Sequence, residues 1–188
     1  MSFTQYETLY PKYFKKLNQM NDNFDSFEYV YGSVGKYLIV YKKMWLTVTN
    51  EKRKNIYDHL FAEYKANKLL VVLIIDKKNP QINLTNLDQP IKHTINKQVK
   101  CPKNEIIFYK SYVVAYYTNL LDFYKTELSE PYISWYENGR KSSEGNLLNS
   151  ELNGKWVFWY NISNHLMPNK KSFVAEYDKG IILNKIEL

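Results

Sequence analysis

Two Asn-Gly pairs set between aromatic, alternating segments constrain the fold of this chain more than any other feature. The pairs are Asn138-Gly139 and Asn153-Gly154, in a chain that has 6 glycines. A two-residue type I′ turn needs positive φ at both central positions, and Asn-Gly supplies it at the lowest steric cost. The pattern therefore predicts consecutive short antiparallel hairpins, with turns at both pairs.

The aromatic pattern of this region recurs along the chain. One constant spacing relates Tyr112, Tyr136 and Tyr160, and the same spacing relates Trp135 and Trp159. Near the C-terminus, Asp178-Lys179-Gly180 falls where a second copy of Leu148-Asn149-Ser150 would lie. Internal repeats of about 20 to 50 residues are typical of stacked arrays. We therefore expect the C-terminal half to consist of repeated hairpin units.

The repeated unit resembles the MORN-type repeats, most closely the bacterial YwqK-like variant. The motif is carried by Tyr136-x-Asn138-Gly139, Glu144-Gly145 and Asn153-Gly154-x-Trp156, and the clean copy spans 132–160 within a resemblance over about 106–188. Gly180 is kept, whereas Ser150, Ala175 and Asn184 stand where the pattern has glycine, as in a degenerate terminal unit. The resemblance implies stacked β-hairpins that serve as scaffolds, protein-docking surfaces or lipid-headgroup contacts, with no catalytic residues.

The first half of the sequence predicts an α+β fold, in which a helix-bearing N-terminal half packs with the C-terminal antiparallel sheet. Apolar residues at helical spacing predict a helix within Gln5–Met20, starting at Pro11, and a second over Glu51–Ala66, capped by Thr49 or Asn50. Strands are expected at Phe27–Tyr31, Tyr37–Tyr41, Met44–Thr49 and Leu69–Ile75. The last is an unbroken apolar run, typical of a strand buried on both faces.

A polar segment from Asp76 to Lys103 separates the two halves and shows no firm periodicity. A structureless link of this length is uncommon inside a compact domain. It either contains an edge strand, at Ile91–Val99, or marks the junction between two modules. We expect modules at 1–104 and 105–188, or one continuous domain.

The net charge of +7 lies entirely in the first half of the chain. Residues 1–100 hold 16 Lys/Arg against 9 Asp/Glu, whereas 101–188 hold 10 of each. Basic side chains interleaved with aromatic rings suit non-specific, salt-sensitive binding of single-stranded nucleic acid. The candidate polyanion-binding residues are Lys42, Lys43, Lys52, Arg53, Lys54, Lys92, Lys97 and Lys100. The alternative is a solvated lysine surface that reflects an AT-rich genome, such as that of a giant DNA virus.

Strand alternation makes both faces of the predicted hairpin sheet apolar. Over 156–160, Trp156, Phe158 and Tyr160 fall on one face, and Val157 and Trp159 on the other. One face then packs on the first half and the other on neighbouring hairpins or a second copy; alternatively, an exposed aromatic patch docks a partner protein. The candidate protein-binding residues are Tyr112, Trp135, Tyr136, Trp156, Phe158, Trp159 and Tyr160.

Catalytic and metal-binding signals are weak. His59, His93 and His165 lack metal-ligand spacing, and Cys101 has no nearby base that would activate it. We expect a non-enzymatic protein without a metal or cofactor, which binds a protein partner or itself, with nucleic acid as the alternative. The single cysteine, the absence of a signal-peptide pattern and the short apolar runs favour a soluble intracellular protein without membrane insertion.

Overall fold

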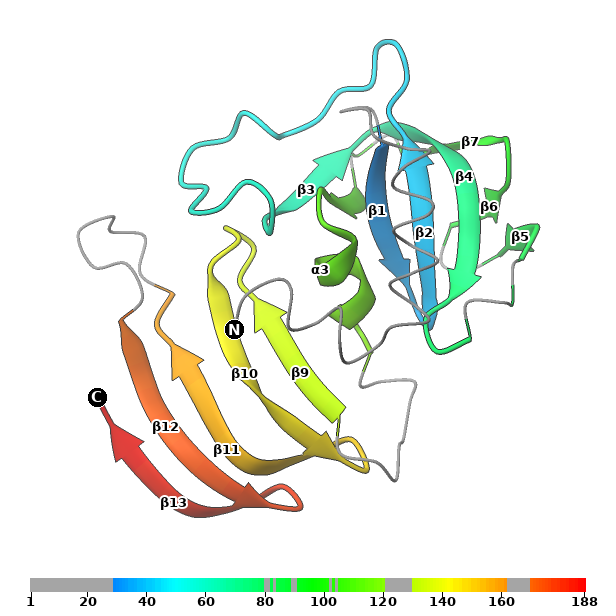
Figure 1. The fold of residues 1–188 in the computed structure, drawn as a ribbon. Coiled ribbons are helices and arrows are strands. Elements are labelled where there is room, and N and C mark those ends of the chain that lie inside the picture. The colour runs from blue at the N-terminus through cyan, green and yellow to red at the C-terminus, as the bar shows by residue number, and fades with distance from the viewer. Residues whose placement is uncertain are drawn as a thin grey trace.

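A computed structural model of the chain describes residues 29–79, 82, 84–88, 91–101, 103, 105–120, 130–161 and 170–188 (Figure 1). These residues form two large antiparallel sheets, a small two-stranded sheet and one short helix. In Figure 1 the N-terminal sheet lies at the upper right, and the C-terminal sheet curves away at the lower left. The helix lies between the two large sheets (Figure 1).

The first sheet has six strands in the order β3-β8-β1-β2-β4-β7. The strands are β1 (Tyr29–Val34), β2 (Tyr37–Lys42), β3 (Glu63–Ala66), β4 (Lys68–Asp76), β7 (Gln98–Lys100) and β8 (Ile106–Tyr109). The predicted strands Tyr37–Tyr41 and Leu69–Ile75 lie within β2 and β4 and are confirmed. β4 contributes to the apolar cores on both faces of the sheet, as an unbroken apolar strand should.

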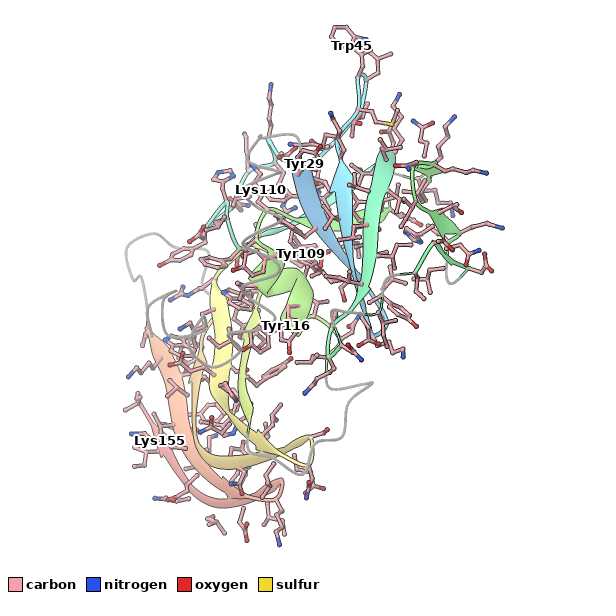
Figure 2. The ribbon with its side chains drawn as sticks, turned by 45° about the vertical axis from the view of Figure 1, so that its right-hand side comes forward. Tyr29, Trp45, Tyr109, Lys110, Tyr116 and Lys155 are labelled. Atoms are coloured by element: carbon pink, nitrogen blue, oxygen red, sulfur yellow. The ribbon has the colours of Figure 1, made fainter. Side chains whose placement is uncertain are left out.

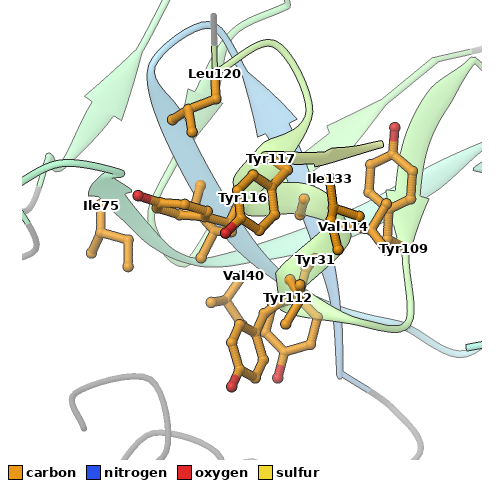
Figure 3. Packing of buried hydrophobic residues seen from close by; sticks show 13 residues of the cluster. Tyr31, Val40, Ile75, Tyr109, Tyr112, Val114, Tyr116, Tyr117, Leu120 and Ile133 are labelled. Atoms are coloured by element: carbon orange, nitrogen blue, oxygen red, sulfur yellow. The ribbon is translucent and has the colours of Figure 1, made fainter. Parts of the chain in front are cut away.

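The helix α3 (Tyr112–Tyr117) closes one face of this sheet. Ser111 caps it, since its Oγ accepts a hydrogen bond from the Val113 amide at 3.2 Å, and all six helical residues are buried. Figure 3 shows the cluster around the helix, in which Tyr112 and Tyr31 meet edge to face with ring centroids 5.9 Å apart. The same cluster includes Ile133 of the second sheet, so the helix joins the two sheets into one packed core.

The second sheet is a meander in which every strand pairs with its neighbour in sequence, in the order β13-β12-β11-β10-β9. Its strands are β9 (Glu130–Trp135), β10 (Lys141–Leu148), β11 (Glu151–Trp159), β12 (Lys171–Asp178) and β13 (Ile181–Glu187). The predicted run of short antiparallel hairpins is therefore present. The first sheet also includes a strand from beyond the predicted module boundary at 104/105, because β8 pairs with β1 and β3.

The hairpin turns agree only partly with the predicted ones. Asn138-Gly139 lies in the connection from β9 to β10, so the position of this turn is confirmed, but positive φ is found at Gly139 (+86°) and not at Asn138, so the predicted type I′ geometry is wrong. The turn predicted at Asn153-Gly154 is wrong, because both residues lie inside β11. The chain turns instead at Asn149-Ser150, with φ values of 53° and 68°, and again at Lys179-Gly180, with 44° and 81°. These two turns occupy corresponding positions of the sequence repeat, so β12–β13 repeats β10–β11.

The prediction of an α+β fold with a helix-bearing N-terminal half is wrong for the described residues, which are mostly β. The predicted helix Glu51–Ala66 is absent: residues 51–62 form an irregular loop and 63–66 form β3. The loop docks on the first hairpin turn, since the amides of Tyr57 and Asp58 both donate to the carbonyl of Asn138, at 2.8 and 3.1 Å. Backbone groups used in this way cannot form helical hydrogen bonds. The predicted helix within Gln5–Met20 lies outside the described residues.

Two other predicted strands differ from the structure. Met44–Thr49 is a loop, with an isolated bridge from Thr49 to Ala66, because its amides bond locally and to Asn67. Within 76–103, the expected strand Ile91–Val99 is divided into β6 (His93–Thr94), which pairs with β5 (Asn86–Leu87), and β7 at the sheet edge. The division falls at Asn96, whose φ of +61° breaks the extended backbone.

Candidate protein-binding surface

Aromatic side chains form a continuous column across one face of the second sheet. Ring centroids are 6.1 Å apart for Tyr132 and Trp156, 6.0 Å for Trp156 and Phe158, and 4.4 Å for Phe158 and Phe173. Trp156 lies at the centre, with 1% of its surface exposed, and its indole nitrogen donates to the carbonyl of Asn146 at 2.9 Å. The column is the core of this sheet, since these rings cover one another.

The edge of β9 connects the second sheet to the first half of the chain. Trp135 stacks on Phe61 of the 51–62 loop, with centroids 5.5 Å apart and an interplanar angle of 5°. Its ring also lies 6.3 Å from that of Tyr117 in α3. Trp135 is therefore an internal contact between the two halves.

The predicted protein-binding residues separate into internal and accessible groups. Tyr112 and Trp156 are buried, and Trp135 is packed as described above. Tyr136 and Phe158 are partly buried, and the Tyr136 hydroxyl donates to the carbonyl of Trp159 at 2.8 Å. Trp159 is also partly buried, with Lys141 Nζ 5.2 Å from its ring centroid, and Tyr160, which is 43% exposed, is the exposed aromatic residue of this set.

The most exposed large apolar side chains of the second sheet lie on its edge strand, β13, and directly after it. Five side chains of the C-terminal segment are exposed by more than half: Ile181 (69%), Ile182 (52%), Leu183 (63%), Ile186 (54%) and Leu188 (56%). Within the described residues β13 pairs with β12 alone. These residues are not among the candidates predicted from the sequence. The internal repeat could have indicated them, because the offset that relates 148–150 to 178–180 also aligns Ile186 with the buried Trp156.

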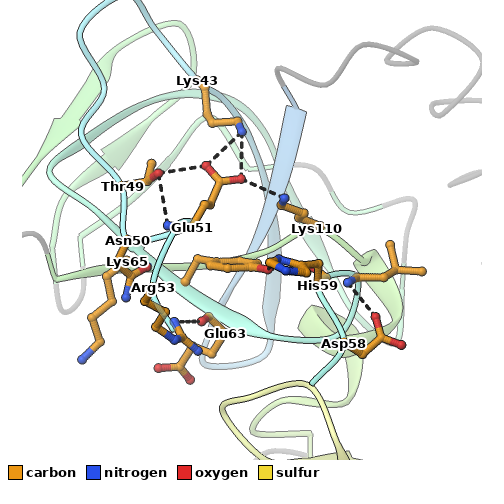
Figure 4. A network of polar contacts seen from close by, with 12 residues as sticks. Lys43, Thr49, Asn50, Glu51, Arg53, Asp58, His59, Glu63, Lys65 and Lys110 are labelled. Carbon is orange, nitrogen blue, oxygen red and sulfur yellow. Dashed lines mark hydrogen bonds and ion pairs between the residues drawn. The ribbon is translucent and has the colours of Figure 1, made fainter. Parts of the chain in front are cut away.

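Several of the predicted polyanion-binding residues are engaged inside the protein. Lys43 and Lys110 each lie 3.1 Å from Glu51, whose carboxylate also accepts a hydrogen bond from Thr49 (Figure 4). Burial disfavours the charged form of Glu51, but the hydrogen bonds from Thr49, Lys110 and Lys43 outweigh it and lower the pKa of this carboxyl. Lys43 is therefore committed to an internal ion pair.

Arg53 joins the 51–62 loop to both halves of the chain. Its guanidinium donates to the backbone carbonyl of Glu63 (Figure 4). It also donates to the carbonyl of Glu137 at 2.7 Å and lies 5.4 Å from the ring centroid of Tyr64. This planar fork acts as a structural clamp. The other predicted basic residues include Lys52, Lys54, Lys97 and Lys100, which are exposed, and Lys92, which lies 3.6 Å from Asp88.

Substitution of Arg53 by lysine is expected to lower the free energy of unfolding by about 1–2 kcal/mol. Lysine keeps the charge but cannot donate to two separated carbonyls, and the part-exposed setting reduces the loss. Urea unfolding followed by circular dichroism measures the change, with Lys52→Ala as the exposed neighbouring control. Equal stability of Arg53→Lys and the wild type would show that the clamp contributes nothing.

A cavity of about 260 Å³ lies where β9, α3 and the start of β3 meet. Glu63 lines it, and its carboxylate accepts a hydrogen bond from the Tyr109 hydroxyl at 3.3 Å. Burial, reinforced by the nearby charge of Glu137, raises the pKa of the Glu63 carboxyl. Burial also raises the pKa of Tyr109, so its phenol remains a donor to Glu63 rather than a base. We assign this contact a structural role.

Two of the other titratable candidates, His93 and His59, have structural partners. His93 is buried: its Nε2 lies 2.9 Å from the Tyr41 hydroxyl and its Nδ1 lies against the carbonyl of Ile91. Burial lowers the pKa of His93, which favours the neutral ring. His59 Nδ1 lies 3.1 Å from the Tyr64 hydroxyl, and Cys101 is a half-buried free thiol. His165 is outside the described residues, among which no three metal-ligating side chains come together.

The fold defines an antiparallel β protein in which a six-stranded sheet and a five-stranded hairpin meander share a core around one short helix. No protein-family model matches the chain, and searches of curated proteins and of solved structures found no match either. Among the described residues, no helix has the length and apolar character needed to cross a membrane.

Proposed function

We propose that the chain is a non-enzymatic binding protein, which docks a β-strand of another protein or of a second copy along β13. The observation that carries this proposal is the set of exposed aliphatic side chains on an edge strand. An edge strand presents unpaired backbone amides and carbonyls, and an added strand uses them while its side chains cover the apolar residues. Natural edge strands usually discourage an added strand by charged residues, proline or a β-bulge. β13 has Lys185 and a register shift against β12, but four of its seven side chains are aliphatic.

The internal repeat supports the same proposal. In the first repeat, β12 pairs along β11, and Trp156 lies opposite Ala175 and is 1% exposed. In the second repeat the sequence offset leads to Ile186, which is 54% exposed and pairs with Val174, so that it lies in line with Val157 on the opposite face of the sheet from Trp156. Each hairpin of a stacked array buries the face of the preceding one. An added strand would flank Ile186 on that face as Val174 of β12 flanks Val157.

The resemblance to MORN-type repeats is part of this proposal. A meander with turns at corresponding positions of successive units is the architecture that the resemblance implies, and protein docking is among the roles it implies. Polyanion binding remains the alternative. We rank it second, because Lys43 is paired with Glu51 and Arg53 clamps two backbone carbonyls. Its test is the double charge reversal Lys52→Glu and Lys54→Glu, which leaves Arg53 in place.

Replacement of Ile182 and Ile186 by lysine together is expected to abolish association at β13. The two residues pair with Tyr177 and Val174 of β12, and lysine at both positions repels an incoming strand. Sedimentation equilibrium over a concentration series measures the association: the mass of the wild type should rise with concentration, and that of the variant should stay at one chain. Ile107→Lys, at a 43% exposed position of β8, is the matched control and should behave as the wild type.

Capture from native lysate distinguishes a foreign partner from a second copy. The lysate is treated with nuclease, and capture is compared at low and high salt between the wild type and the Ile182→Lys, Ile186→Lys variant. A discrete protein retained by the wild type and lost by the variant would support docking of a foreign strand. A wild type that stays a single chain and captures nothing in a β13-dependent way would contradict the proposal.

A further inference from the structure

The loop between β2 and Thr49 presents an apolar tip to solvent. Trp45 is 88% exposed, Leu46 71% and Val48 55%, and these are among the most exposed large apolar side chains of the described chain. Figure 2 shows Trp45 at the extreme end of the molecule, far from Lys155 in the second sheet. The tip is thus a separate surface from β13, and an indole in this position needs a partner to remove it from water.

The tip is held in a defined turn. The Thr47 amide donates to the carbonyl of Met44 at 3.0 Å, and the Met44 amide donates to the Thr47 hydroxyl at 2.9 Å. The Val48 amide is fixed to the side chain of Asn67 at 2.9 Å. Leu46 has φ +64°, a left-handed conformation that is unfavourable for a leucine. The backbone therefore keeps the side chains of Trp45 and Leu46 projecting, at a local conformational cost.

Lysine side chains gather at the same end of the first sheet. β2 ends at Lys42, directly before the loop, and Lys68 and Lys100 lie opposite each other at the adjacent ends of β4 and β7. Like charges directly across a strand pair are destabilising, and neither Lys68 nor Lys100 forms an ion pair with a described residue. Gln98 Nε2 lies 3.2 Å from Met44 Sδ, which ties β7 to the loop.

We infer that this end of the first sheet is a docking surface for an anionic lipid bilayer. Tryptophan favours the headgroup region, where its ring is shielded from water and its N–H stays hydrated. Leu46 would enter the acyl boundary beside it, while the lysines meet the negative headgroups. The opposed Lys68 and Lys100 are explained by the same contact, because anionic headgroups relieve their repulsion. The association is peripheral and reversible, since the tip is only a few residues long.

The character of the tip favours lipid over nucleic acid. A tryptophan beside lysines could also stack on a base. Leu46 and Val48, however, are aliphatic and offer no ring for stacking, whereas a bilayer buries them. Tyr41, which precedes Lys42 in the chain, is itself buried and is no stacking platform. The exposed set is thus one indole with aliphatic neighbours, which fits a lipid surface.

Co-sedimentation of the full chain with vesicles tests this inference. Vesicles of phosphatidylcholine with phosphatidylserine should retain the protein at low salt, and vesicles of phosphatidylcholine alone should retain much less. The variant Trp45→Ser with Leu46→Asn should lower the partition coefficient at least about tenfold; asparagine is chosen because it tolerates positive φ. Lys68→Glu with Lys100→Glu should remove the preference for phosphatidylserine.

Two controls separate the tip from general apolar or charge effects. Ile82→Ser, beside the end of β4 opposite Lys68, and Lys155→Glu in the second sheet change exposed residues away from the tip, and both should bind vesicles as the wild type does. Equal vesicle binding by the tip variant and the wild type would overturn the inference. So would a wild type that binds no vesicle, or a tip variant that loses binding to a single-stranded oligonucleotide while its vesicle binding is unchanged. Circular dichroism confirms that each variant is folded.

Discussion

Replacement of Trp156 by alanine is expected to lower the free energy of unfolding by about 3–5 kcal/mol, the largest effect of any single substitution considered for this chain. The side chain is 1% exposed, lies between Tyr132 and Phe158, and donates a hydrogen bond to the Asn146 carbonyl. Alanine leaves a cavity at the centre of the aromatic column and an acceptor without its donor. Both effects act in the same direction.

Urea unfolding followed by circular dichroism measures this loss without depending on tryptophan fluorescence. Trp159→Ala, further along the same strand, is the matched control, because it makes the same chemical change at a half-buried position. It should cost clearly less than Trp156→Ala. Comparable losses for the two variants would contradict the assignment of Trp156 to the buried core.

Replacement of Gly145 by alanine is expected to cost up to about 3 kcal/mol, because the site has no room for one more carbon. A Cβ at this position would lie 2.3 Å from the nearest ring atom of Trp156. The ring is buried, so it cannot swing into solvent to relieve the clash. Glycine is therefore required at 145 by the close approach of an indole, not by its own backbone angle.

Two comparisons isolate this cause. Gly154→Ala has no atom within 4 Å of the added Cβ but has φ +67°, so it should cost about 1–2 kcal/mol from backbone strain alone. Gly145→Ala in the Trp156→Ala background should cost almost nothing, since the clashing ring is gone. The interaction between the two substitutions should therefore be large. A Gly145→Ala cost that is the same in both backgrounds would rule out the clash as its cause.

The expected losses of stability determine which substitutions can test the binding proposal. Trp135, Trp156 and Tyr112 were reasonable candidates from the sequence, but all three pack inside the protein. Loss of partner capture after their truncation would reflect damage to the fold. Substitutions on β13, or at Tyr160, change exposed side chains and leave the aromatic column intact. They are the appropriate probes of docking.

The sequence predicts the internal repeat but not the register in which the strands of its hairpins pair. Asn149-Ser150 and Asn153-Gly154 can both adopt positive φ, and local preference favours Asn-Gly for the turn. The structure uses Asn149-Ser150 as the turn and places Gly154 in a bulge, between the pairs Asn146–Asn153 and Glu144–Val157. This register brings Trp156 over Gly145. The free energy gained by burying the Trp156 indole exceeds the local preference of Asn-Gly for a turn, so the burial decides the register.

The apolar periodicity of residues 51–66 also predicts a local structure that tertiary contacts override. Its apolar residues fit a helix, yet Phe61 stacks on Trp135 and Tyr64 lies in β3. Isolated helices of this length are marginal in water, so docking on the turn at Asn138 decides the conformation. No local signal marks Asn138 as that partner, because it lies far along the chain. The loop tip at Trp45 was missed for a related reason: strand alternation describes Met44–Thr49 equally well until the structure shows that no strand pairs with it.

The sequence by itself determined which segments favour extended structure, the strand over Leu69–Ile75, the turn at Asn138-Gly139 and the correspondence between 148–150 and 178–180. These depend on side-chain type and short-range backbone preference, which a sequence records directly. The tertiary structure alone decided the hairpin register, the loop in place of a second helix and the roles of Arg53 and Gly145. It also decided which apolar residues stay exposed, at Trp45 and on β13. Each of these depends on a contact between residues distant in the chain, where the energy of burial or of a backbone hydrogen bond exceeds the local preference.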